Sequence, residues 1–151
     1  MIQAIQITPE ILTSNTDNIN FDTVDLRTNS ANCCGWLQYM PGGSDFTIIG
    51  GGLFEISFNA NVTSETDGLV ALALKSGTSD VEGTEMVAEV ITPGNYINVS
   101  FNKLIRLCPR VNTVVAVGSL PGTLTGTTTP TTEVTEIPVV KDANIIIRKI
   151  A

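Results

Sequence analysis

The decapeptide LFEISFNANV, residues 53–62, limits most strongly what this chain can fold into. Apolar and polar side chains alternate along it without a break. The apolar set is Phe54, Ile56, Phe58, Ala60 and Val62, and the polar set is Glu55, Ser57, Asn59 and Asn61. A period of two places the sets on opposite faces of a β-strand. The stretch therefore predicts a strand with one buried face and one face that meets water or a partner.

Further β-rich runs follow, separated by turn sequences such as SETDG and TPGN. They cover residues 68–75, 85–92, 95–108, 113–118 and 144–150, and shorter ones upstream cover 19–26, 36–40 and 46–49. No segment shows a helical period over three turns. Many short strands joined by Gly, Pro and Asn turns are typical of a sandwich or a barrel. We therefore predict an all-β, two-sheet jelly-roll sandwich.

The domain organisation is simple, because 151 residues with 42% hydrophobic content suit one globular domain. Residues 1–18 are polar and weakly patterned, so we expect an N-terminal arm there and the jelly-roll domain over residues 19–151. Residues 121–138 are Thr-rich and have no repeating apolar face, which predicts a long exposed loop. Both segments are expected to reach a neighbouring molecule.

Composition argues against several function classes. The chain has no His, which removes the commonest general base, and its aromatic content of 5% is poor for a sugar-cleaving cleft. A net charge of −7 with 8 Lys and Arg opposes binding to nucleic acid. The opening residues resemble neither a signal peptide nor a membrane span. We expect a non-enzymatic protein without a cofactor, made in the cytoplasm, with neither nucleic acid nor membrane as a partner.

Three cysteines raise the question of thiol chemistry. Cys33 and Cys34 are adjacent, the nearest basic residue in sequence is Arg27, and Cys108 completes an odd set without the spacing of a zinc clip. Thiols without chemistry are the favoured interpretation, and redox or metal chemistry is the alternative. Whether the three are free stays open at this stage.

Four carboxylates surround one predicted pair of turns, and carboxylate oxygens can hold Ca²⁺. They are Asp67, Asp80, Glu82 and Glu85. Their spacing matches no known calcium loop, so solvated turns are the favoured interpretation and we predict no metal site.

The strand blocks resemble a known family. The sequence GGGLFEISF places Gly52 before Phe54, Ile56 and Phe58, and the chain ends on the alternating aliphatic run NIIIRKI, residues 144–150. This pattern resembles the tumour necrosis factor-like jelly roll, which includes the globular heads of complement proteins. The segments FEISFNANVTS, INVSFNKLIR and IPVVKDANIIIRKI resemble segments of small stand-alone proteins of this type in phages and prophages of gut Firmicutes.

The resemblance implies a compact homotrimer in the virion, acting as a capsid decoration or fibre-head module and contacting other virion proteins through the N-terminal arm. The expected subunit interface contains Trp36, Tyr39, Ile146 and Ile150. The alternative is a recognition module for a receptor or a host-surface glycan. Its candidate ligand loop contains Thr123, Thr127, Thr128 and Thr129. A carboxylate-dependent hydrolase is the least favoured class.

Overall fold

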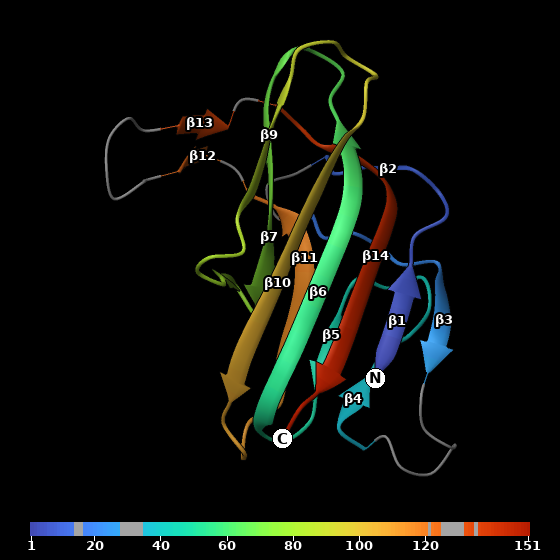
Figure 1. Cartoon of the computed structure of the whole chain (residues 1–151), viewed down its shortest axis with the longest axis vertical. Helices are drawn as coiled ribbons and strands as arrows, with labels where there is room; N and C mark the ends of the chain where they lie inside the picture. The colour runs from blue at the N-terminus through green and yellow to red at the C-terminus, as the bar shows by residue number, and fades with distance from the viewer. Residues whose placement is uncertain (14–16, 28–34, 121, 125–131, 135) are drawn as a thin grey trace.

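In the computed structural model of the chain, two six-stranded β-sheets pack face to face (Figure 1). The structure describes residues 1–13, 17–27, 35–120, 122–124, 132–134 and 136–151. All strand pairings within these ranges are antiparallel. The same residues form no helix, and so none that is long and apolar enough to cross a membrane.

The first sheet is the nearer one in Figure 1. Its strands are, in spatial order, β10 (Ile97–Leu107), β6 (Gly52–Thr63), β14 (Val139–Lys149), β1 (Ile2–Ile5) and β3 (Thr23–Arg27), with β2 (Glu10–Ile11) pairing separately with β14. The long strands β10, β6 and β14 form its centre and one edge, and both chain termini lie at its lower end (Figure 1).

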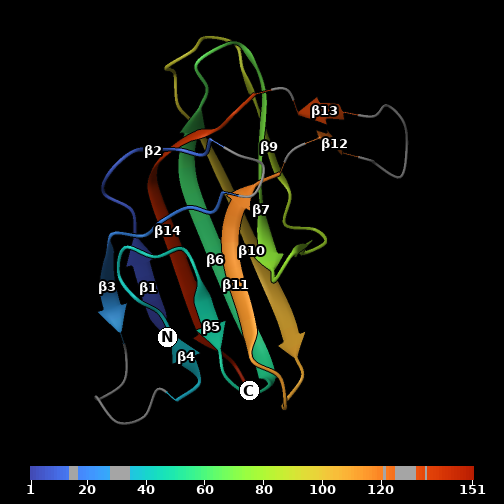
Figure 2. The same ribbon diagram turned by 180° about the vertical axis from the view of Figure 1, so that it is seen from behind.

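The second sheet faces the viewer in Figure 2. Its strands are, in spatial order, β4 (Leu37–Gln38), β5 (Phe46–Ile48), β11 (Thr113–Ser119), β7 (Gly68–Ser76) and β8 (Ser79–Asp80), with β9 (Met86–Val90) also pairing with β7. A separate two-stranded sheet contains β12 (Gly122–Leu124) and β13 (Thr132–Val134).

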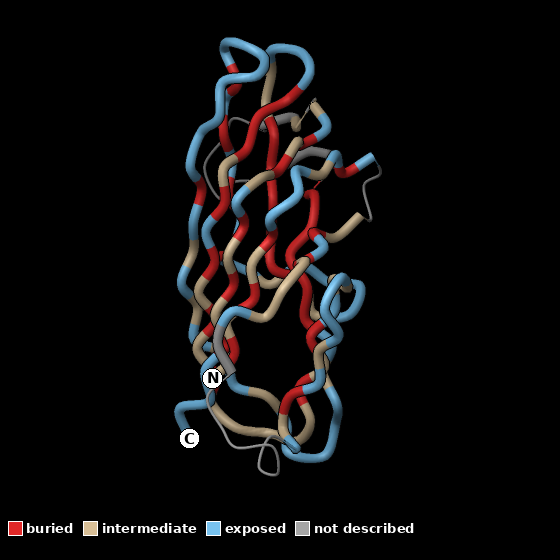
Figure 3. The backbone as a smooth tube through the Cα atoms, turned by 90° about the vertical axis from the view of Figure 1, so that its right-hand side faces the viewer, coloured by how far each residue is buried: buried red, intermediate tan, exposed pale blue. Residues whose placement is uncertain are grey.

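Strand β6 confirms the prediction made from its alternating sequence. The side chains of Phe54, Ile56 and Phe58 are at most 2% exposed and point toward the second sheet, whose Leu72 and Leu74 belong to the same core cluster. Seen from the side, buried residues line the inner surfaces of both sheets (Figure 3). Each large side chain buried in this way stabilises the fold by about 1.5–3 kcal/mol through removal of apolar surface from water.

Strand β7 is buried on both faces. Its alternate residues Ala71 and Ala73 turn away from the main core and form a second cluster with Leu120, against which Val134 packs. Two main-chain hydrogen bonds join the covering segment to β7, from Leu120 N to Ala71 O (2.9 Å) and from Glu136 N to Leu69 O (3.0 Å).

The prediction of a long exposed loop over residues 121–138 is therefore wrong in part, because β12 and β13 pair within it and β13 lies against β7. β-Branched Thr and Val favour strands, but a Thr-rich sequence shows no apolar alternation by which a strand is recognised.

The prediction of an N-terminal arm over residues 1–18 is also wrong. Strand β1 lies between β14 and β3, with Ile2 opposite Ile147, and the side chains of Ile2, Ala4 and Leu12 are at most 1% exposed. The apolar alternation in β1 is too short to stand out in the sequence. Its place in the sheet becomes apparent only from its pairing with β14 and β3.

Two of the predicted strands are displaced. Residues 19–22 precede β3 and connect to the second sheet, with Ile19 N donating to Val117 O (2.8 Å) and Phe21 N to Gly43 O (3.0 Å). The last strand begins at Val139, earlier than expected, and has an irregular register between Lys141 and Asn144. Asp142 there has a φ of 53°. The alternation of apolar and polar residues is interrupted at this bulge. The sequence pattern therefore does not predict the first half of the strand.

The burial of β1 leads to a test with a matched pair of isoleucines. We expect Ile2→Ala to lower the free energy of unfolding by about 2–5 kcal/mol, because it opens a cavity in the core. Ile7→Ala alters a side chain that is 62% exposed and should change stability by less than about 0.5 kcal/mol. Urea unfolding followed by circular dichroism measures both. Equally small effects would show that residues 1–5 behave as a free arm.

Candidate functional site

The outward surface of the first sheet is the candidate interaction face of this protein. We call it the outer face and define it by the exposed and half-buried side chains at the centres of β6, β10 and β14. It contains Glu55, Ser57, Asn59, Asn61, Asn98, Ser100, Asn102, Leu104, Asn144, Ile146 and Arg148. The register of the strands aligns these side chains in rows across the sheet, such as Ser100, Asn59 and Asn144.

Side-chain hydrogen bonds join neighbouring strands across the outer face. Asn98 Nδ2 donates to Asn61 Oδ1 (3.2 Å), and Asn61 Nδ2 donates to Asp142 Oδ2 (3.1 Å) at the bulge of β14. Lower on the face, Asn102 Nδ2 donates to Glu55 Oε1 (3.3 Å). These cross-strand contacts orient the amides and keep much of the surface polar without charge.

The charged side chains of the outer face neutralise each other. Glu55 forms an ion pair with Arg148 from the neighbouring strand. Its hydrogen bonds, first from Asn102 and then from Arg148, lower the pKa of the Glu55 carboxyl, which is therefore ionised at neutral pH. No local sequence pattern predicts this contact, because the two residues are 93 positions apart in the chain. The face therefore has no net charge, although the chain carries −7.

Two residues predicted for the subunit interface have structural roles within the chain. Trp36 is half-buried, and its ring lies 5.5 Å from that of Phe54 between centroids. Tyr39 stacks on Phe46 at 4.2 Å, and its hydroxyl lies 2.5 Å from the carbonyl oxygen of Phe21. Both rings thus pack against the core, and their contact with another subunit stays a prediction.

The pKa of Tyr39 is raised to about 12 from the ordinary value of 10.0. Burial is the main cause, and the negative charge of Asp22 adds to it, while a main-chain hydrogen bond opposes it. The neutral hydroxyl is therefore the form that the folded chain favours.

The other two predicted interface residues lie on the first sheet. Ile146 stands within the outer face, opposite Ser57 on β6. Ile150 follows β14 and is 47% exposed, and its main-chain N donates to Leu53 O (2.8 Å). The structure therefore places Ile146 on β14 and Ile150 directly after that strand, whereas Trp36 and Tyr39 flank β4 of the second sheet.

The candidate ligand loop is described only at its base. Thr123 lies in β12 and pairs with Glu133 of β13. Thr127, Thr128 and Thr129 lie outside the described residues, as do Cys33 and Cys34. Cys108 is an exposed free thiol at the end of β10.

The four carboxylates considered for calcium are not gathered at one place. Asp67 precedes β7 and Asp80 follows it, so the length of a nine-residue strand separates them. Glu82 contributes its main-chain oxygen to Lys103 Nζ (2.6 Å). In the parts of the chain that the structure describes, no three His, Cys, Asp or Glu side chains are grouped to hold a metal ion.

Comparison with known proteins adds the fold relationship. No family model matches the sequence. A search of curated proteins also finds no match. Among solved structures, the globular domain of zebrafish complement 1qA protein aligns over 99% of this chain and 96% of its own, with a TM-score of 0.62 and 14% identity. Murine APRIL, crystallised at pH 8.0, aligns over 99% of this chain and 98% of its own, with a TM-score of 0.49 and 9% identity.

The chain has the predicted fold, an all-β, two-sheet jelly roll of the tumour necrosis factor-like class. At 14% identity, the likeness to the complement domain extends to the fold alone.

The raised pKa of Tyr39 predicts a loss of stability at high pH. The unfolded chain ionises this phenol near pH 10, whereas the folded chain keeps it neutral up to about pH 12. Its contribution to the free energy of unfolding is thus complete below pH 10 and falls as the pH rises through that interval. Tyr39→Phe should remove this component. Denaturant unfolding of both proteins at several pH values measures it, since all other groups titrate equally in the two. The prediction would be contradicted if the free energy of unfolding changed with pH in the same way for both proteins.

Proposed function

We propose that this chain is a non-enzymatic structural protein that forms a homotrimer through the outer face and serves on a bacteriophage particle as a capsid decoration or fibre-head module. Two kinds of support carry the proposal. The outer face supports self-association, and the sequence resemblance described above supports the location on a virion.

The observation that carries the self-association is the neutral outer face of an acidic chain. Subunits with a charge of −7 repel one another, and a face without net charge is where this repulsion is weakest. The amides of Asn59, Asn98 and Asn102 can donate and accept hydrogen bonds across such a contact. Apolar groups in the same area, Leu104 and Ile146, add buried surface.

A closed ring suits this geometry. Contacts in which one part of the outer face meets a different part of the next copy either close by rotation or continue into a filament, and a ring of three leaves neither part unpaired. Closure also keeps the sheet surface away from further chains, which protects it from open-ended association.

The virion role is supported by sequence rather than by chemistry at a site. The segments FEISFNANVTS and IPVVKDANIIIRKI carry the resemblance to phage and prophage proteins. In the structure they correspond to β6 and β14, the two paired strands at the centre of the first sheet. The strands that carry the resemblance thus also present most of the outer face.

A substitution in the middle of the outer face tests the trimer. Light scattering of the native protein should give about 48 kDa, three times the 16.0 kDa chain. Ser57→Arg should produce monomers, because closure would bring three new positive charges into one contact. Val87→Arg, at a 43% exposed position of β9 in the second sheet, is the control and should leave the trimer intact. A native monomer would contradict the trimer and favour the recognition-module interpretation.

The location is tested on the particle itself. Antibodies raised against the purified protein should label regularly spaced sites on the source virion in electron micrographs, and mass spectrometry of washed particles should detect the chain. Labelling confined to host cells, with the chain missing from washed virions, would refute the virion role.

A further inference from the structure

Exposed isoleucines follow the upper half of β14, along the edge that faces away from β6. We call them the isoleucine strip and define it by Ile5, Ile7, Ile11 and Ile137. Ile7 is 62% exposed, Ile11 48% and Ile137 49%, and Ile5 is half-buried. Strand β2, which contains Ile11, lies near the upper end of the first sheet (Figure 1). None of the four belongs to the outer face as defined above.

The strand register places the strip on the outward surface of the first sheet. Ile5 is paired with Asn144, which belongs to the outer face. Ile11 is paired with Val139, and the next residue of β14, Val140, is fully buried in the core. Because successive side chains of a strand point to opposite faces, Val139 and Ile11 point outward. The strip and the outer face therefore lie on the same side of the sheet.

Two hollows open along the isoleucine strip. The first has a volume of about 320 Å³ and lies between residues 5–7 and residues 142–144. The second has a volume of about 210 Å³. It is lined by Ile11, Glu65, Thr66, Glu136 and Ile137. Each hollow thus combines two isoleucines with at least one carboxylate.

Neighbouring side chains hold two of these carboxylates in place. Asp142 Oδ2 accepts a hydrogen bond from Asn61 Nδ2 (3.1 Å), a side chain of the outer face, and this contact keeps the carboxylate on the outward surface. Glu136 accepts a hydrogen bond from the Thr66 hydroxyl, which lines the same hollow. Within the described residues, neither carboxylate accepts a second hydrogen bond, so each retains acceptor capacity for a ligand.

Negative charge prevails around the strip. The segments that form it and its hollows, residues 5–11, 65–66 and 136–144, contain four carboxylates and a single cation, Lys141. Lys141 Nζ lies 3.9 Å from the centroid of the Tyr96 ring. Tyr96 directly precedes β10, on the far side of β6, so Lys141 is held away from the strip. Among the described residues that line the two hollows, none is Lys or Arg.

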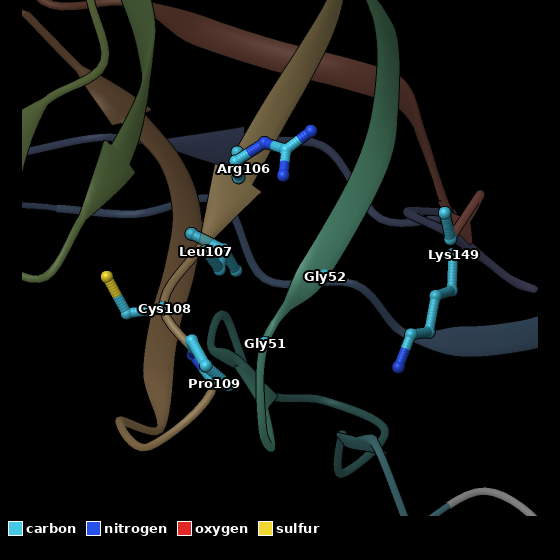
Figure 4. A pocket seen from close by; sticks show the side chains of 8 residues that line it. Gly51, Gly52, Arg106, Leu107, Cys108, Pro109 and Lys149 are labelled. Atoms are coloured by element: carbon cyan, nitrogen blue, oxygen red, sulfur yellow. The ribbon is translucent and has the colours of Figure 1, made fainter.

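Other cations of the first sheet lie at its lower end. Arg106 and Lys149 stand near Gly52, where β6 begins (Figure 4). Arg148 precedes Lys149 on β14 and is paired with Glu55. The length of β14 therefore separates these positive charges from the strip, and the carboxylates at the upper end have no cation to neutralise them except Lys141 within the segments named above.

We propose that the isoleucine strip binds an extended segment of another protein that carries Lys or Arg side chains. Exposed apolar surface with a polar rim is typical of a protein contact, and the carboxylates select a basic partner by charge complementarity. The aliphatic stems of Lys and Arg lie along the isoleucines, and their charged ends donate hydrogen bonds to Asp142 and Glu136 in the hollows. The inference goes beyond the proposed function and does not require the trimer.

The test is a titration of the full-length protein with the acetylated and amidated pentapeptide KAKAK, followed by the amide chemical shifts of Ile7 and Ile137. The acidic peptide EAEAE should cause no shift. Asp142→Asn and Glu136→Gln should each weaken the binding of KAKAK by about threefold or more, the effect of losing one exposed charge pair. Glu89→Gln removes an exposed carboxylate from β9 of the second sheet. It is the matched control and should leave binding unchanged.

A second pair of variants tests the apolar part of the contact. Ile7→Ser should weaken the binding of KAKAK by about threefold or more, because it removes surface that a lysine stem covers. Ile91→Ser, at a 79% exposed position after β9, is the control and should have no effect. Light scattering of each variant measures its mass, which separates a loss of this site from a change in oligomeric state.

Binding of KAKAK with this pattern of variants supports the site. The proposal is overturned if KAKAK causes no shift at about 10 mM, if EAEAE binds equally, or if either control weakens binding as much as its matched variant does. It is also overturned if the mass of the protein alone rises with concentration and Asp142→Asn abolishes the rise, because a second copy would then occupy the strip.

Discussion

Strand β6 is paired with a neighbouring strand on each side, and this pairing organises both faces of the first sheet. Its register with β10 is continuous from Gly52 to Val62, and its register with β14 is interrupted only at the bulge of Asp142. Because both edges of β6 are hydrogen-bonded, the direction of each of its side chains is fixed. Phe54, Ile56 and Phe58 point into the core, and the polar residues between them lie on the outer face. A shift of one residue would exchange the two faces completely. The same pairing thus defines the core and the candidate interaction face.

The register of the first sheet decides where its charged side chains stand. The outer face is broad, rich in amides and neutral, which suits a large contact. In the middle of this face Arg148 is paired with Glu55 from the neighbouring strand. Toward the end of the strands, Arg106 lies opposite outward-facing Leu53, whereas Lys149 lies opposite core-facing Phe54, with its Nζ over the Phe54 ring. The two cations therefore stand on opposite faces of the sheet.

The N-terminal residues join the two layers. Strand β1 extends the first sheet, and the segment after it makes main-chain hydrogen bonds to the second, at Val117 and Gly43. The Tyr39 ring lies at the same junction, stacked on Phe46 with its hydroxyl at the Phe21 carbonyl oxygen. The N-terminal segment therefore stabilises the sandwich through backbone contacts and through buried side chains such as Ile2, Leu12 and Phe21.

The amino-acid pattern alone predicts the all-β class, the central strands and the division of β6 into a buried and an outward set, because a long period-two pattern fits only a strand with two unlike faces. It also predicts that Asn59 and Asn61 are polar residues on the outward face. The remaining features depend on the folded arrangement. Strand β1 is too short to reveal its pattern, and Thr-rich β12 and β13 have no apolar alternation. The partners of Glu55, Arg148 and Asn102, come from strands distant in sequence. Contacts between segments far apart in the chain follow from sheet order and register, which local periodicity does not encode.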